Sequence, residues 1–459
     1  MPFLGAVGYF NRLGFPRIKD TLINLHEEFG PIVRFTLFGQ EQVAVADAGM
    51  VEQIYRNEGT YPFRPSPPPF KEYFEKYTPK LPRTYVSMQG QEWKEDRTPA
   101  NPPMMRPMEM KDWVVTFSHA AGDLCDILEA RACASAQREV SVSLLLQEWA
   151  VESATRMLLR RRDMGILSGK DERGLRFISA MRGFFEGSAK LSASLPLFKL
   201  YETNDYLKTT GAFEDAFHIA EEWVKEAMHS GTFEEDNGLP QGVAQALLAK
   251  GMPTDRVASH SVTLIGGAGD TTSRAAAFTL LALAMNPAIQ EELREEVLGR
   301  TAATGRAAEE FDHDDLQALP LVRATHKEQM RLWPIAFANQ RILPDDIELG
   351  GYHIPAGSSF LISHAAMLMR RDYFGDDVDT FRPHRWLEEK RPAFAAAWFG
   401  VGPRACIGRR VAENELYTMV ANVLSRYRVE PGTDAENIQA ITKLILMPDR
   451  DVNLRFVPL

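Results

Sequence analysis

The residue best placed for chemistry is Cys406, which lies in the glycine-rich stretch 399–408 (FGVGPRACIG). The residues that follow lack glycine and proline and carry apolar residues at helical spacing, so we expect the cysteine at the N-terminus of an amphipathic helix. Backbone N–H groups and the positive end of the helix dipole stabilise a thiolate there. Such a thiolate suits the iron of haem. The alternative is a buried cysteine in a glycine-rich turn.

A second stretch with side chains suited to chemistry is 264–273 (LIGGAGDTTS), inside a predicted long helix over 259–285. Its three glycines cost up to about 1 kcal/mol each relative to alanine, so a reason for them is expected. Small residues permit close approach of a ligand and a local opening of the helix. Asp270 and Thr271 add an acid and an alcohol, groups that can supply protons when dioxygen is reduced. The alternative is a kink with a solvated Asp–Thr pair.

Two further pairs have helical spacing. Trp93 and Arg97 are four residues apart, and Glu328 and Arg331 are three residues apart on a helix that ends before Pro334. Pairs of this kind occur on many helices and usually contribute little to stability, so neither identifies a site alone.

Composition sets the outline of the fold. The chain has 459 residues, of which 45% are hydrophobic and 25% charged, as in an ordinary globular protein. No linker or change in composition divides it, so we expect a single domain over 1–459. The fold class predicted is α+β, mainly α with a small β subdomain and a β-rich N-terminal part at about 30–60. The net charge of −10, without a basic stripe, argues against nucleic acid as a partner.

The cellular compartment is constrained only loosely. Three cysteines do not make a disulfide framework, which favours a reducing compartment. No apolar run reaches the roughly 20 residues that a membrane span needs. The N-terminal residues resemble neither a signal peptide nor a transit peptide, so we expect either a cytosolic protein or a chain that starts after a removed targeting segment.

Hydrophobic periodicity and the placement of proline predict the remaining elements. An apolar cluster near 194–196 either packs as ordinary core or forms a lid that rests on a membrane surface. The expected elements are strands over 32–38 and 42–46, a helix over 48–58, a proline-rich loop over 62–69, helices over 110–157 and 175–228, and strands over 342–357 and 441–459.

These stretches together resemble the cytochrome P-450 family. The stretch 399–408 matches the haem-binding signature of that family, including the leading phenylalanine, the arginine two positions before the cysteine and the glycine two positions after it. The stretch 264–273 resembles its oxygen-activation motif, in which an acid precedes two hydroxyl residues; Ala268 replaces the second glycine of that pattern.

The resemblance implies haem b as cofactor and Cys406 as the axial ligand of its iron, within a haem-binding core at about 250–430. It implies that Asp270 and Thr271 relay protons. Glu328 and Arg331 would form a buried structural network with Arg385, which lies in a stretch reading FRPHRW. The residues expected to hold the haem propionates are Trp93, Arg97, Arg341 and Arg404.

A haem-thiolate monooxygenase needs electrons, and this chain has no G-x-G-x-x-G motif or cysteine cluster to supply them. The stretch 92–107 and the C-x-G-R-R sequence resemble the mitochondrial branch, which implies an adrenodoxin-like ferredoxin with its NADPH ferredoxin reductase. Peripheral association with the matrix side of the mitochondrial inner membrane is expected; the cytoplasm and the endoplasmic reticulum are alternatives, as is a bacterial-type or microsomal donor. The basic residues expected to dock the ferredoxin, rather than form a merely solvated face, are Arg323, Lys327, Arg409 and Arg410.

Members of that branch mostly hydroxylate sterols, steroids and secosteroids, so a sterol-like substrate is expected. Apolar side chains do not distinguish a sterol from a fatty acid or a xenobiotic. A haem-thiolate isomerase that needs no external electrons and a haem-binding sensor are further alternatives, although the Asp–Thr pair argues against both. The residues expected to line the substrate pocket are Ile265, Ala268, Ile335, Ala336, Phe337 and Leu444.

Overall fold

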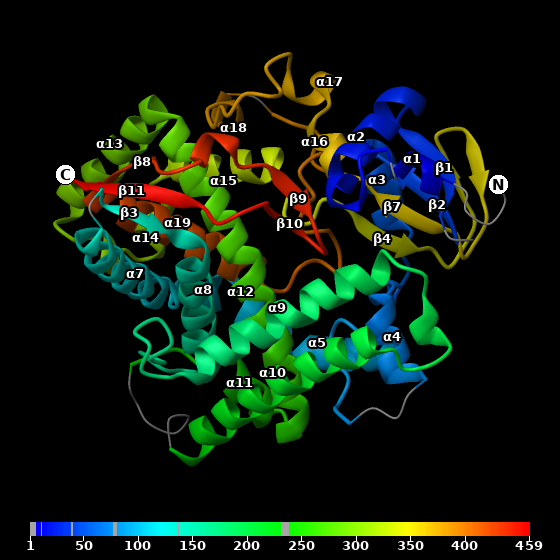
Figure 1. Cartoon of the computed structure of the whole chain (residues 1–459), viewed down its shortest axis with the longest axis horizontal. Coiled ribbons are helices and arrows are strands. Elements are labelled where there is room, and N and C mark those ends of the chain that lie inside the picture. Colours follow the sequence, from blue (N-terminus) through cyan, green and yellow to red (C-terminus); the bar gives the residue numbers. More distant parts are fainter. Residues whose placement is uncertain are drawn as a thin grey trace.

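The longest helix, α12 (Thr254–Met285), runs through the middle of the molecule, and other helices pack around it (Figure 1). The computed structural model describes residues 6–10, 12–37, 40–76, 80–135, 137–230, 238–388 and 390–459.

Two glycines explain how α12 packs so closely. A Cβ at Gly266 would lie 2.4 Å from Met181 Cε on α9 (Arg173–Ser192), and one at Gly269 would lie 2.6 Å from Val151 Cγ2 on α8 (Val142–Leu159). Both distances are too short for a real contact. Gly269 is required because the side chain of Val151 is short and stiff, whereas at Gly266 the end of the flexible Met181 side chain would have to move. The expected opening of the helix is wrong, because α12 is an unbroken α-helix.

The helices account for most of the chain, as the fold-class prediction expected. The others are α1 (Val7–Phe10), α2 (Ile18–Phe29), α3 (Ala48–Arg56), α4 (Pro68–Glu75), α5 (Gly90–Met105), α6 (Pro107–Lys111), α7 (Val114–Ala134), α10 (Asn204–His229), α11 (Val243–Ala249), α13 (Pro287–Thr304), α14 (His313–Gln317), α15 (Pro320–Leu332), α16 (His364–Leu368), α17 (Arg371–Phe374), α18 (Arg385–Glu388) and α19 (Arg409–Arg426), with 3₁₀ turns η1 (Phe15–Arg17), η2 (Leu197–Lys199), η3 (Ala308–Glu310) and η4 (Ala435–Asn437).

A four-stranded sheet beside the helices joins distant parts of the chain in the order β1-β2-β7-β4. β1 and β2 are antiparallel with Val33 opposite Ala44, β2 and β7 are parallel, and β4 and β7 are antiparallel with Arg341 opposite Phe360. The N-terminal strands therefore depend on strands some 300 residues later, and the β-rich part is not confined to 30–60. These strands are β1 (Ile32–Leu37), β2 (Gln40–Val45), β4 (Asn339–Ile342) and β7 (Ser359–Ile362).

Three smaller sheets complete the fold. The C-terminal residues form strands on both sides of Pro448-Asp449, as expected, but each strand pairs with a different partner. One sheet has the order β3-β11-β8, and the other two pair β10 with β9 and β5 with β6. Their bounds are β3 (Glu139–Ser141), β5 (Ile347–Leu349), β6 (Tyr352–Ile354), β8 (Tyr427–Pro431), β9 (Ala440–Thr442), β10 (Leu446–Pro448) and β11 (Asn453–Pro458).

Two other local predictions are wrong. The proline-rich loop is shorter than expected, because α4 begins at Pro68, where the missing N–H of proline costs no helical hydrogen bond. The helix expected over 110–157 is interrupted between α7 and α8 by the short strand β3, which pairs with β11.

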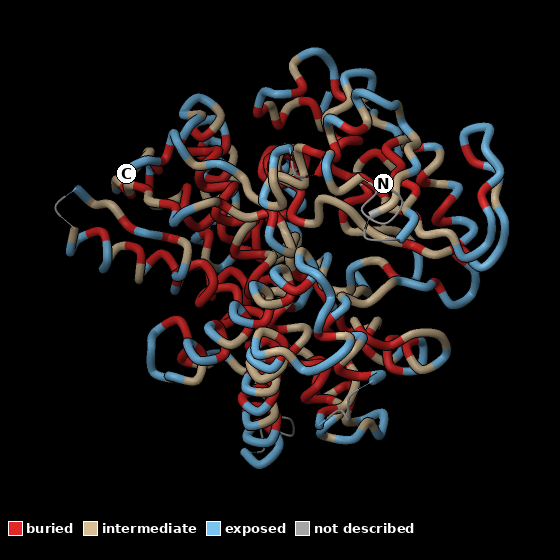
Figure 2. The backbone as a smooth tube through the Cα atoms, turned by 45° about the vertical axis from the view of Figure 1, so that its right-hand side comes forward, coloured by how far each residue is buried: buried red, intermediate tan, exposed pale blue. Residues whose placement is uncertain are grey.

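Buried residues concentrate in the interior of the molecule, and exposed residues lie mainly on its outer faces (Figure 2). The largest apolar cluster joins α7, α8, α12 and α19, and a second lies beneath α9 and α10. Along the described ranges, no helix combines the length and the apolar character needed to cross a bilayer.

Candidate functional site

Cys406 lies in a tight loop that ends at α19. Gly400 and Gly402 have φ values of 72° and 77°, a left-handed conformation that favours glycine. The N–H of Cys406 donates to the carbonyl of Phe399 at 2.8 Å, which closes the loop. The sequence therefore folds as expected around the thiol, and the helix begins three residues after it.

The Cys406 thiol borders space enclosed by the protein. Its side chain is accessible, yet burial raises its pKa above the ordinary value. The N–H of Gly408 and the charges of Arg97 and Arg64 lower the pKa in part. A thiol that is accessible from one side and otherwise surrounded by protein can be deprotonated by a bound metal ion, since coordination favours the thiolate.

Four arginines converge on this space, among them Arg64, which the sequence analysis missed. Burial, together with the nearby charges of Arg64, Arg341 and Arg97, lowers the pKa of Arg404 to about 9. The Cys406 thiolate charge acts in turn on the pKa values of Arg64 and Arg97. The site thus concentrates positive charge around one potential thiolate.

Two of these arginines, Arg97 and Arg404, are held by hydrogen bonds to backbone carbonyls. Arg97 Nη2 donates to the carbonyl of Ala405 at 2.8 Å. Arg404 donates to the carbonyls of Pro62 and Met88 and lies 3.9 Å from the ring centroid of Trp93. The face of the Trp93 ring therefore supports the guanidinium of Arg404 through a cation–π contact.

Arg341, on β4, is paired with a carboxylate that no motif indicated. Its Nε donates to Glu58 Oε2 at 2.7 Å, and Glu58 is 3% exposed. Glu58 Oε1 has no hydrogen-bond partner among the described residues, and a Cβ at Gly402 would lie 2.6 Å from it. Glu58 thus contacts both Arg341 and the cysteine loop.

The donor set fits haem b. One carboxylate, Glu58, stands against four guanidinium groups, so the space has a surplus of positive charge that two propionates would neutralise. The guanidinium of Arg64 makes no hydrogen bond or ion pair with the described part of the chain. The thiol supplies the soft ligand that haem iron accepts.

A strip of α12 is not packed against other elements. Gly267, Ala268 and Thr271 are partly accessible, and a Cβ at Gly267 would meet no atom within 4 Å. The hydroxyl of Thr271 donates to the carbonyl of Gly267 at 2.6 Å. This strip is thus open to a ligand and carries one hydroxyl.

Asp270 points away from that strip, toward α8 and α9. It is 9% exposed and accepts hydrogen bonds from Gln147 Nε2 and Arg274 Nη2, both at 3.1 Å. Gln147 in turn accepts from Arg182, whose side chain reaches the surface. Asp270 and Thr271 are adjacent in sequence but face different environments; Gln147 and Arg182 carry no sequence signal that links them to Asp270.

The six residues expected to line the substrate pocket lie in different surroundings. Ile265 is 1% exposed in the cluster beneath α9 and α10, whereas Ala268, three residues later on α12, is partly accessible. Phe337 packs against the N-terminal apolar cluster. The N–H of Leu446 donates to the carbonyl of Ile335 at 3.0 Å, which brings the β9–β10 hairpin, with Leu444 at its turn, beside Ile335 and the partly buried Ala336.

Glu328, Arg331 and Arg385 meet in the interior, all at 0% exposure. Glu328 accepts from Arg331 at 2.8 and 3.0 Å, from Arg385 Nε at 3.0 Å and from Trp386 Nε1 at 2.8 Å. The two guanidinium groups also donate to carbonyls of the segment that leads toward the cysteine loop, including those of Phe374 and Val378.

Three of the four cations expected on the docking face lie close together. The pKa of Lys327 is lowered by burial and by the charges of Arg323 and Arg409. Glu413, which accepts a hydrogen bond from Arg409, is the acidic neighbour in this group. Arg410 does not join them: it turns toward the end of α5, where it donates to the carbonyl of Met105 at 2.7 Å.

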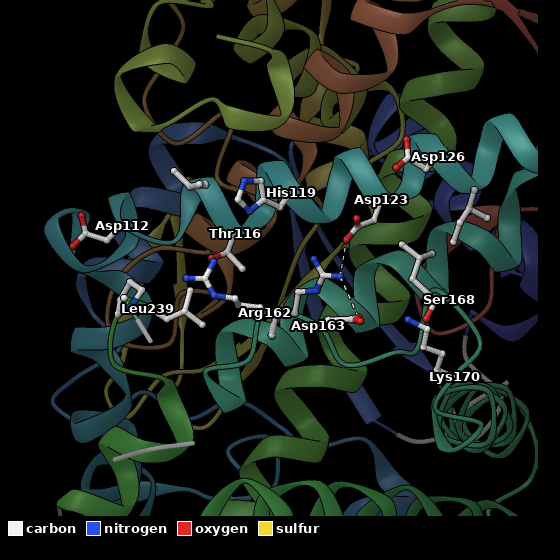
Figure 3. Close-up of a pocket in the computed structure, with 16 residues that line it drawn as sticks. Asp112, Thr116, His119, Asp123, Asp126, Arg162, Asp163, Ser168, Lys170 and Leu239 are labelled. Carbon is white, nitrogen blue, oxygen red and sulfur yellow. Dashed lines mark hydrogen bonds and ion pairs between the residues drawn. The ribbon is translucent and has the colours of Figure 1, made fainter. Parts of the chain in front are cut away.

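A cavity of about 770 Å³ lies elsewhere, between α7 and the end of α8 (Figure 3). Its walls include Asp123, Asp163, Arg162 and Lys170, and it contains none of the residues described above. A charged cavity of this kind is unsuited to an apolar ligand.

Comparison with known proteins identifies the family of this chain. A family model for cytochrome P-450 covers residues 1–456. The chain is similar to "Cholesterol side-chain cleavage enzyme, mitochondrial" of Mesocricetus auratus, with 30% identity over 100% of this chain and 89% of that protein. It is similar to "Sterol 26-hydroxylase, mitochondrial" of Homo sapiens, with 27% identity over 100% of this chain and 88% of that protein. The chain therefore belongs to the cytochrome P-450 family of haem-binding monooxygenases.

Proposed function

We propose that this monooxygenase holds its haem through Cys406 and hydroxylates a sterol-like substrate with electrons from a ferredoxin. The observation that carries the proposal is the Cys406 loop: a thiol at the start of α19, beside a Gly408 N–H, faced by a surplus of arginine charge. Haem ligated by thiolate activates dioxygen for insertion of one oxygen atom into an unactivated C–H bond.

The residues around the loop would fix the cofactor. Arg64, Arg97, Arg341 and Arg404 would neutralise the two propionates, and Trp93 would support Arg404. Glu58 would limit the positive charge that the site carries before the cofactor binds.

Thr271 and Asp270 would have different roles in supplying protons to the site. The Thr271 hydroxyl lies on the open strip of α12, where it can donate to a ligand after releasing the carbonyl of Gly267. Gln147 and Arg182 do not themselves transfer protons, but they connect Asp270 to the surface, where its carboxylate would exchange protons with solvent.

The substrate proposal rests on the relatives and on an apolar wall. Both relatives carry names that refer to cholesterol or sterols. Ala268, Ala336 and Leu444 are apolar and partly accessible, as a pocket for such a molecule requires. Fatty acids and xenobiotics are the competing classes, and a ligand panel separates them.

The electron donor would dock on Arg323, Lys327 and Arg409. These residues lie on α15 and at the start of α19, the helix that follows Cys406. Their mutual proximity lowers the pKa of Lys327, as expected of a concentrated positive patch. An acidic ferredoxin would be steered to it by long-range attraction.

A membrane surface would bind the connection between α9 and α10. Leu195, Leu197, Leu200 and Tyr201 are 61%, 46%, 78% and 58% exposed, and Lys199 lies among them. An exposed apolar patch with a neighbouring cation suits a lipid interface. Together with the mitochondrial relatives, it supports association with the matrix side of the mitochondrial inner membrane.

Reconstitution tests the proposal. The holoenzyme is combined with adrenodoxin-type ferredoxin, its reductase and NADPH, and then given a sterol or a fatty acid. We expect the wild type to hydroxylate the sterol in an oxygen-dependent reaction. In Thr271→Ala, most of the electrons from NADPH should instead reduce dioxygen to hydrogen peroxide. Turnover of fatty acids alone would contradict the substrate class. Rearrangement of an organic peroxide without any donor would instead favour an isomerase.

A further inference from the structure

A buried ionic cluster joins α5 to α12 and has no place in the mechanism above. Asp96 and His260 are 4% and 0% exposed. Asp96 Oδ2 accepts from His260 Nε2 at 2.5 Å and from Arg256 Nε at 2.7 Å. Both partners come from α12, whereas Asp96 lies on α5 between Trp93 and Arg97.

The protonation of this cluster is set by burial. Burial lowers the pKa of His260, and the Asp96 carboxylate opposes that shift only in part. Burial raises the pKa of Asp96, but His260 and Arg256 together bring it below its ordinary value. At neutral pH the pair is thus a carboxylate and a neutral imidazole that donates through Nε2.

The segment before α5 is tied to the same point. The ring of Tyr85 stacks on His260 with centroids 3.7 Å apart and planes 12° apart. The hydroxyl of Ser259 donates to the carbonyl of Pro82 at 2.7 Å. One turn of α12 therefore holds both α5 and the segment that leads into it.

The other face of α5 reaches the cysteine loop. Arg97, the residue after Asp96, donates through Nε to Asn101 at 2.7 Å and through Nη2 to the carbonyl of Ala405 at 2.8 Å. Ala405 directly precedes Cys406. A continuous series of contacts thus runs from His260 through Asp96 and Arg97 to the residue that precedes the proposed ligand.

We propose that Asp96 and His260 are positioning residues that fix α5 on α12, set Arg97 against Ala405 and thereby hold Cys406 in the geometry that ligates haem. The contacts favour this role over general stability because the carboxylate is charge-paired, buried and one residue from Arg97. The inference rests on the proposed role of Cys406.

A double-mutant cycle tests it on the purified holoenzyme. The variants are Asp96→Ala and His260→Ala, each alone and combined with Arg97→Ala. The matched control is Glu95→Gln, an exposed carboxylate on the same helix. Two readouts are taken: the rate of haem loss to apomyoglobin, and the fraction of the reduced CO complex that has the thiolate-ligated band.

Coupling through Arg97 predicts a specific pattern. Asp96→Ala speeds haem loss about tenfold in the wild-type background but less than about twofold in the Arg97→Ala background, because contacting residues are not additive. The thiolate-ligated fraction falls in parallel. Asp96→Asn keeps the acceptor oxygen and stays within about threefold of the wild type, and Glu95→Gln changes neither readout.

Equal factors in both backgrounds would overturn the inference and leave Asp96 with a purely structural role. If Asp96→Ala does not fold, the His260→Ala cycle answers the same question, since Arg256 still pairs the carboxylate. Absence of the thiolate band from the wild-type enzyme would instead contradict the proposed function itself.

Discussion

Replacing Glu328 by glutamine tests the buried network most severely. The substitution keeps the size of the side chain but removes its charge and turns one acceptor oxygen into a donor. Arg331 and Arg385 then remain in the interior, each at 0% exposure, without their shared carboxylate.

The structure sets the expected size of the effect. Glu328 accepts two hydrogen bonds from Arg331 and one each from Arg385, Trp386 Nε1 and the N–H of Arg382. Removing one partner from a buried charge network costs about 3–5 kcal/mol. A domain is usually stable by only about 5–15 kcal/mol, so this single change removes a large part of the total.

The assay is equilibrium unfolding in urea, followed by tryptophan fluorescence and by circular dichroism. The matched control is Glu52→Gln, which breaks an exposed pair with Arg56 and should cost less than about 1 kcal/mol. A Glu328→Gln variant within about 1 kcal/mol of that control would refute the reasoning, because it would mean that the two arginines find other partners or water.

Burial raises the pKa of Glu415 to about 8, so the folded state retains a proton that the unfolded state loses. The stability of the wild type relative to Glu415→Gln should therefore fall as the pH rises from about 4.5 to about 8. Midpoints of urea unfolding across that range check the sign. Lys327→Gln should raise the KM for ferredoxin by about threefold to tenfold at low salt and leave kcat unchanged, whereas Lys250→Gln, directly after α11, should have no effect. Steady-state kinetics at two ionic strengths decide this. Gly269→Ala forces a Cβ to 2.6 Å from a valine side chain of α8 and should destabilise by about 1–3 kcal/mol. Gly267→Ala meets no atom within 4 Å and should instead stabilise by up to about 1 kcal/mol, as thermal unfolding of the two variants will show.

The parts of the site that the sequence could indicate are those with local signatures. The loop around Cys406 is defined by glycines and a following helix within a few residues, and Asp270 and Thr271 are adjacent on one helix. The spacing of Glu328 and Arg331 also gives a contact at helical range. In each case the chemistry and the residues that position it are close in the chain.

The remaining parts depend on contacts across hundreds of residues. Glu58 contacts Arg341 only because the fold brings β4 and the end of α3 together, and hydrophobic periodicity in the sequence does not indicate such a contact. Asp96 lies three residues after Trp93, yet its partner His260 is 164 positions away.

The most direct test of the account is the reduced-CO difference spectrum of the wild type and of Cys406→Ala. We expect the band of thiolate-ligated haem in the wild type and its complete loss in the variant, with the far-ultraviolet circular dichroism unchanged. A thiolate band that persists in Cys406→Ala would contradict the central claim, since it would assign the ligand to Cys125 or Cys133.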